Sequence, residues 1–168
     1  MLNNISFFFK ISFPTITLIF LTFFNLFIAK DFFDFGQLFI FQAIFFWLLY
    51  LPRFLPFYII LFLGIFQDII YLSPLGSTSL IFFFLIFLFD KYNKFFLEPS
   101  FVELYLSFIF LFCIGSISLW SMNSLINLKV LSININLLYE IFLNIFFFPI
   151  NYFILYIFFK KLNLEKKL

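Results

Sequence analysis

The residue with the clearest potential for chemistry is an aspartate inside an apolar stretch. Asp68 lies in the run Leu63-Gly64-Ile65-Phe66-Gln67-Asp68-Ile69-Ile70, about one helical turn before the end of a hydrophobic segment. A carboxylate in such a segment is costly unless it is paired, so it is a candidate for function. Gly64 lies four residues earlier on the same helix face, where it would let a neighbouring helix approach closely.

The residues after Asp68 favour a structural role for its carboxylate. Ser73-Pro74 is typical of a helix start, with Ser as N-cap and Pro at the first helical position. The next turn offers unpaired backbone N–H groups and hydroxyl groups, those of Leu75, Gly76, Ser77 and Thr78. Because a helix N-terminus attracts a carboxylate, we expect Asp68 to accept hydrogen bonds there and to lock a helical hairpin. The alternative is that Asp68 lines a polar cavity or contacts a partner.

The other polar residues inside apolar stretches are mainly amides, which usually form hydrogen bonds between helices. They are Asn25, Gln42, Asn144 and Asn151. Pro149 is expected to kink the last helix and to free a backbone carbonyl, which Asn144 or Asn151 could help to satisfy.

Catalysis is not expected. The chain has no His, and Cys113 is its single Cys, so neither a Ser/His/Asp set nor a disulfide framework can form. Asp68 has no acidic neighbour within a helical turn, and no acidic pair has metal-ligand spacing on one helix. We therefore expect no enzymatic activity, no metal site and no cofactor. The small net charge of +2 does not suggest nucleic-acid binding.

Composition identifies the elements that must position these residues. Of the 168 residues, 65% are hydrophobic and only 11% are charged, whereas soluble domains carry roughly a quarter charged residues. Charges and turn residues divide the chain into six apolar stretches of about membrane-spanning length. They are residues 11–29, 35–51, 54–71, 74–90, 101–121 and 135–159. The sequence thus predicts an all-α, polytopic membrane protein, with residues 1–168 as one integral membrane domain.

The positions of the cations predict the orientation. If the N-terminus is cytoplasmic, eight of the ten Lys and Arg residues lie on the inner side: Lys10, Arg53, Lys91, Lys94, Lys160, Lys161, Lys166 and Lys167. Only Lys30 and Lys129 then lie outside. Cytoplasmic loops of membrane proteins carry such an excess of positive charge. Both termini are therefore expected on the cytoplasmic side of the membrane.

The segment around Asp68 resembles the MreD family of rod-shape-determining membrane proteins. The resemblance rests on Gly64-x-x-x-Asp68 in an apolar helix, followed by Ser73-Pro74-Leu75-Gly76. Leu51-Pro52-Arg53 is similar to the family's short cytoplasmic turn before this helix. Asn144, with Pro149 five residues later, is similar to the family's last helix. The likeness covers roughly residues 35 to 160.

This resemblance implies a role in cell shape but no reaction. Proteins of this family work with MreC, a single-pass protein, in an assembly (the elongasome) that links MreB filaments to the RodA glycosyltransferase and its transpeptidase. The assembly directs lateral peptidoglycan synthesis. The implied fold resembles the six-helix substrate-binding subunits (S components) of energy-coupling-factor transporters.

Three functions fit these features to different degrees. The first is a non-enzymatic scaffold of the elongation machinery. The second is a substrate-binding membrane subunit of a vitamin transporter, with Asp68 in its pocket, although few converging polar groups are visible. An intramembrane enzyme that acts on a lipid carrier ranks below both, because the chain lacks the carboxylates or His residues that such chemistry uses.

Overall fold

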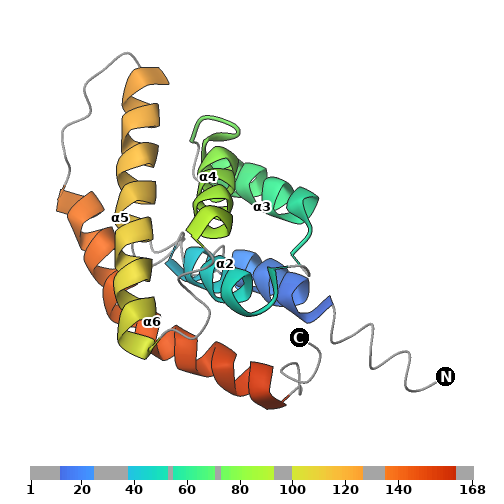
Figure 1. The fold of residues 1–168 in the computed structure, drawn as a ribbon. Coiled ribbons are helices and arrows are strands. Elements are labelled where there is room, and N and C mark those ends of the chain that lie inside the picture. Colours follow the sequence, from blue (N-terminus) through green and yellow to red (C-terminus); the bar gives the residue numbers. More distant parts are fainter. Residues whose placement is uncertain are drawn as a thin grey trace.

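The computed structural model describes residues 12–24, 38–52, 55–70, 73–92, 100–126 and 135–161. Almost all of these residues are helical, so the predicted all-α class is confirmed. The described ranges contain six helices (Figure 1): an N-terminal helix Ser12–Phe24, α2 (Leu38–Tyr50), α3 (Phe57–Ile70), α4 (Ser77–Tyr92), α5 (Phe101–Ile126) and α6 (Ile135–Lys161).

The six helices lie where the six apolar stretches predicted them, with shifted ends. Helix α3 begins at Phe57 and α4 at Ser77, each three residues later than expected, whereas the residues before the N-terminal helix and α2 lie outside the described ranges. Helix α5 continues to Ile126, five residues past its expected end at 121, because Ser121, Asn123 and Ser124 do not interrupt it. Ser and Asn lower helix propensity only slightly, so a helix with tertiary support can include them.

Helix α2 is the centre of the fold. Every residue from Ile40 to Leu48 is buried, including the polar Gln42. Figure 1 shows α2 crossing the middle of the molecule, and it packs most extensively against α6. Trp47 donates a hydrogen bond from Nε1 to Thr17 Oγ1 of the N-terminal helix over 2.9 Å. A helix that is hydrophobic all round is expected to be enclosed in this way.

Aromatic rings fill the space between α2, α5 and α6. The Phe108 ring of α5 stacks on Phe148 of α6 with a centroid distance of 4.0 Å. It meets Phe45 of α2 edge-on at 5.5 Å. Phe41 of α2 and Phe112 of α5 form a T-shaped pair at 4.9 Å. Offset-stacked and edge-to-face pairs are the favourable geometries for rings, so a Phe-rich sequence can still specify one packing arrangement.

The start of α5 is fixed by a reciprocal pair of hydrogen bonds. Ser100 N donates to Glu103 Oε2 at 2.8 Å, and Glu103 N donates to Ser100 Oγ at 3.4 Å. This Ser-x-x-Glu capping box satisfies two backbone N–H groups that the helix leaves unpaired. Glu103 is thus used at a helix terminus, at an exposed position.

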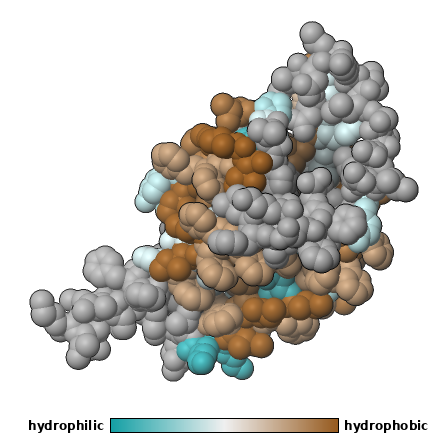
Figure 2. Space-filling model, turned by 180° about the vertical axis from the view of Figure 1, so that it is seen from behind, coloured by the Kyte–Doolittle hydropathy of each residue, from teal (hydrophilic) through white to brown (hydrophobic). Residues whose placement is uncertain are grey.

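The surface of the described helices is strongly apolar. Large hydrophobic side chains are exposed on the N-terminal helix and on α3 to α6, among them Phe20, Phe62, Phe87, Phe110 and Phe142. Figure 2 shows brown and tan residues over most of the described part of the face behind that of Figure 1. Two helices, Phe101–Met122 and Ile141–Lys161, are long and apolar enough to cross a membrane.

Two phenylalanines of α5 provide a matched test of this packing. Phe108 is fully buried, whereas Phe110 is 65% exposed. We expect Phe108→Ala to lower the free energy of unfolding by about 3–5 kcal/mol, because it leaves a cavity in the ring cluster. Phe110→Ala should change it by less than about 0.5 kcal/mol. Thermal unfolding of both variants in the same mild detergent measures the difference, and equal losses would contradict this core assignment.

Candidate functional site: the Asp68 lock and the polar contacts of α6

Asp68 is fully buried near the end of α3, and its carboxylate accepts hydrogen bonds from four residues that follow it. Oδ1 accepts from Ser73 Oγ at 2.8 Å and from Ser77 Oγ at 3.1 Å. Oδ1 also accepts from Thr78, through its backbone N at 3.2 Å and its Oγ1 at 2.5 Å. Oδ2 accepts from Gly76 N at 2.6 Å. The expected hydrogen bonds from Gly76, Ser77 and Thr78 are therefore present, whereas the expected donor Leu75 does not contribute one. We call this group the Asp68 lock.

The Asp68 lock replaces a conventional N-cap. Gly76 O accepts the first helical hydrogen bond, from Leu80 N, so Gly76 is the N-cap residue of α4. Its φ is +91°, a conformation that favours glycine, and it has no side chain that could cap the helix. Asp68 supplies the missing acceptor to Thr78 N, two residues beyond the cap, which is where a capping side chain normally binds.

The expected N-cap at Ser73 and the expected first helical position at Pro74 are wrong. Ser77 N donates to Pro74 O at 3.0 Å, which closes a turn at Pro74 to Ser77 before the helix begins. Ser73 N donates to Asp68 O, also at 3.0 Å, and so satisfies a carbonyl near the end of α3. The Ser73 hydroxyl binds Asp68 instead of capping α4. Positive φ at Gly76 allows this extra turn, and the sequence motif alone does not reveal it.

Gly64 brings α3 and α4 into close contact, as predicted. A Cβ at this position would lie 2.7 Å from both Cα and N of Ser79. Ser79 Oγ donates to Leu61 O across the same contact at 3.0 Å. Backbone atoms cannot move aside as a flexible side chain can, so this crossing requires glycine.

A second buried polar group lies beside the lock. Gln67 is 1% exposed, and neither its Oε1 nor its Nε2 has a hydrogen-bond partner among the described residues. No role is predicted for Gln67 from the sequence. Its position next to Asp68 on the buried face of α3 was the signal available.

The amides of α2 and α6 bind one another, as expected for amides between helices. Gln42 Nε2 donates to Asn144 O at 3.0 Å and lies 3.5 Å from Asn144 Oδ1. Asn151 Nδ2 donates to Gln42 Oε1 at 3.0 Å. All three side chains are buried, with Asn144 fully enclosed. Asn25 lies outside the described residues, as does Arg53.

Pro149 lies inside α6, and Figure 1 shows that this helix changes direction in its middle. A proline cannot donate to the carbonyl four residues earlier, here that of Ile145. Tyr105 of α5 fills the gap, since its hydroxyl donates to Ile145 O at 3.2 Å. The sequence suggested Asn144 or Asn151 for this carbonyl, but the donor is Tyr105, and Asn151 donates to Gln42 instead. No local pattern points to Tyr105, because the contact depends on how α5 crosses α6.

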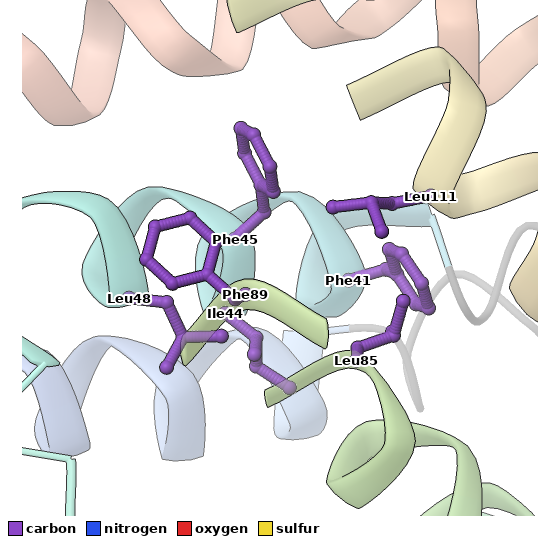
Figure 3. Close-up of a pocket in the computed structure, with 7 residues that line it drawn as sticks. All are labelled: Phe41, Ile44, Phe45, Leu48, Leu85, Phe89 and Leu111. Atoms are coloured by element: carbon purple, nitrogen blue, oxygen red, sulfur yellow. The ribbon is translucent and has the colours of Figure 1, made fainter. Parts of the chain in front are cut away.

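The interior between α2, α4 and α5 is closely packed (Figure 3). The void there has a volume of about 10 Å³ and is lined only by apolar side chains, Phe41, Ile44, Phe45, Leu48, Leu85, Phe89 and Leu111. A second hollow of about 530 Å³ lies open at the surface between the N-terminal helix and α3. Asp68 lines neither of them. Among the described residues, no group of three or more His, Cys, Asp or Glu side chains could hold a metal ion.

Comparison with known proteins identifies no relative of this chain. No protein-family model matches the chain, and no curated protein and no solved structure matches it significantly. Its function must therefore be inferred from the residues and their geometry.

The Asp68 lock predicts that removal of one carboxylate oxygen lowers the stability of the protein. Asp68→Asn replaces an acceptor by an NH2 group, which then faces the donors at the start of α4. We expect the free energy of unfolding to fall by about 1–3 kcal/mol, the usual cost of leaving a buried polar group unsatisfied. Thermal unfolding in mild detergent measures this, with Glu103→Gln at the exposed capping box as a control of smaller effect. An unchanged melting profile together with lost partner binding would instead favour a role in recognition.

The close contact of α3 with α4 predicts a difference between two glycines. Gly64→Ala places a methyl group against the Ser79 backbone, and overpacking of this kind costs about 1–3 kcal/mol. Gly115→Ala is the matched control, because its nearest neighbour is the Phe41 ring atom Cζ at 3.1 Å, at the end of a side chain that can shift. Melting temperatures of the two variants should therefore separate, with Gly64→Ala lower. The same loss at both positions would argue against a backbone contact at Gly64.

Proposed function

We propose that the chain is a multi-pass protein of the bacterial cytoplasmic membrane, with about six embedded helices and both termini in the cytoplasm. Its apolar surface supports this proposal. In the most apolar parts of Phe101–Met122 and Ile141–Lys161, only 22% and 28% of the residues are buried. The core helix of a soluble protein would be mostly buried, whereas lipid can cover an apolar surface of this extent.

The remaining helices are apolar but shorter. The N-terminal helix, α2, α3 and α4 have 13 to 16 residues each, which corresponds to roughly 20–24 Å at the rise of an α-helix. The hydrocarbon core of a bilayer is about 30 Å thick. Each of these helices borders on residues outside the described ranges. The sequence there is apolar after α3, at Tyr71-Leu72, but polar before α2, at Gln37, and after α4, at Asn93-Lys94. The proposal of six spans therefore rests on the sequence for these four.

Within the membrane, we propose a non-enzymatic scaffold that resembles MreD and organises lateral peptidoglycan synthesis to maintain rod shape. The observation that carries this proposal is the α3–α4 hairpin. Gly64, Asp68 and Gly76, on which the resemblance to MreD rests, all contribute to one structural unit: a close helix contact, a buried carboxylate and a positive-φ cap. Pro74 lies in the turn between them. Such a rigid hairpin suits a protein that presents a fixed surface to partners.

The packing of the interior supports a scaffold over a vitamin-transporter subunit. Pockets for small molecules measure about 300–1,000 Å³ and contain several converging polar groups. The void between α2, α4 and α5 is far smaller, and Asp68 already accepts hydrogen bonds on both oxygens. The larger hollow is open, and Thr22 and Tyr58 are the only lining side chains there with polar groups.

Partner capture tests the proposed function directly. Tagged protein is extracted from its native host in mild detergent and purified, and the proteins that copurify are identified by mass spectrometry. We expect MreC first, together with MreB, RodA and its transpeptidase. The same extraction from cells that carry the tag on an unrelated six-helix membrane protein is the control.

Two results would overturn the scaffold proposal. Recovery of transporter ATPases and their coupling subunit would assign the chain to vitamin uptake. Depletion of the protein without any change in rod width would show that it does not maintain cell shape. Widened or rounded cells after depletion, with MreC recovered, would support it.

A further inference from the structure

Pro149 divides α6 into a first limb, residues 135–148, and a second limb, residues 150–161. Proline has no N–H group, so the backbone hydrogen bond from residue 149 to the carbonyl of Ile145 is missing. A helix interrupted in this way bends at the break, and contacts with neighbouring helices then determine the angle. In α2, the side chain of Gln42 makes such contacts with α6.

Gln42 of α2 binds one residue on each side of this break. Its Nε2 donates to Asn144 O of the first limb at 3.0 Å, and its Oε1 accepts from Asn151 Nδ2 of the second limb at 3.0 Å. Gln42 is 1% exposed and lies in the part of α2 that is buried throughout. Water and lipid headgroups therefore cannot readily replace these hydrogen bonds.

Each limb also has a separate contact of its own. The first limb is held by Tyr105, which donates to Ile145 O at 3.2 Å. The second limb is held by a hydrogen bond of 2.6 Å between the hydroxyl groups of Tyr152 and Tyr50. Neither of these two hydrogen bonds connects one limb with the other. Rings of α2 also contact both limbs, Phe45 with Phe148 and Phe46 with Tyr152, but ring contacts are less directional than hydrogen bonds. Loss of the Gln42 contacts would thus leave both limbs docked, with the angle between them less narrowly set.

We infer that Gln42 is a clamp that sets the bend of α6, so that this helix is a hinge held closed by one buried amide. A small movement of Gln42 then changes the angle between the limbs, and this change displaces the two ends of α6 most. Hinges that absorb a large change at a few residues are a common way to move one part of a membrane bundle against another.

The distance between the two limbs tests this inference. Spin labels are attached to Cys residues at Phe142 and Ile157, which are exposed at 63% and 62% and lie on opposite sides of Pro149. Cys113 is first replaced by Ala, and this labelled protein is the parent. Pulsed electron paramagnetic resonance in lipid nanodiscs then measures the distribution of distances. We expect a narrow distribution in the parent and a broader or shifted one after Gln42→Met.

Two further variants keep the test decisive. Gln67→Met removes a buried amide that has no hydrogen-bond partner among the described residues, so it should leave the distribution unchanged. If Gln42→Met does not fold, Asn151→Leu removes the contact to the second limb alone and should broaden the distribution as well. A folded Gln42→Met or Asn151→Leu protein with the parental distribution would overturn the clamp.

Discussion

The fold of the α3–α4 hairpin depends on how the first backbone N–H groups of α4 are satisfied where little water is available. The N-cap residue of this helix is a glycine, which has no side chain to offer. Asp68 of the preceding helix provides the acceptor, and its own buried charge is in turn stabilised by donors from the turn and the first residues of α4. This exchange fixes both the position of the turn and the register in which Gly64 meets Ser79. One carboxylate therefore stabilises the start of α4, and Gly64 allows α4 to lie close to α3.

Polar contacts specify the rest of the bundle for the same reason. In the membrane that we propose, apolar side chains pack about equally well against lipid and against another helix, so hydrophobicity alone does not determine which helices become neighbours. Hydrogen bonds between buried side chains do determine which helices are neighbours, because an unsatisfied amide or hydroxyl in apolar surroundings is costly. The hydrogen bond of Gln42 holds α6 beside α2, and the hydrogen bond of Trp47 holds the N-terminal helix beside it. Ring stacking around Phe108 then fixes the distance between the helices.

Most of the helices and the nature of the Asp68 lock could be predicted from the sequence, because both depend on local pattern. Apolar stretches separated by charges predicted all six helices, and the spacing from Asp68 to Ser77 and Thr78 predicted the hydrogen bonds. The start of α4 could not be predicted, because Ser73-Pro74 is equally compatible with a helix start and with the turn that Gly76 allows. Tyr105 could not be found either, since its contact with Ile145, which lies 40 residues later in the chain, depends on how α5 crosses α6. Contacts of this kind depend on the path of the chain in space, which a single sequence does not encode in any local pattern.

The burial of residues 40–48 of α2 has a consequence for the order in which the molecule is completed during synthesis. Helix α2 leaves the ribosome before α6, and the groups that hold Gln42 belong to α6 and follow about 100 residues later. Until they are made, Gln42 has neither of its amide partners from α6, and the neighbouring rings lack Phe148. At typical rates of about 5–20 residues per second, this interval lasts on the order of 5–20 s. The growing chain therefore holds an incomplete centre for seconds, during which a chaperone or the insertion machinery has time to shield α2.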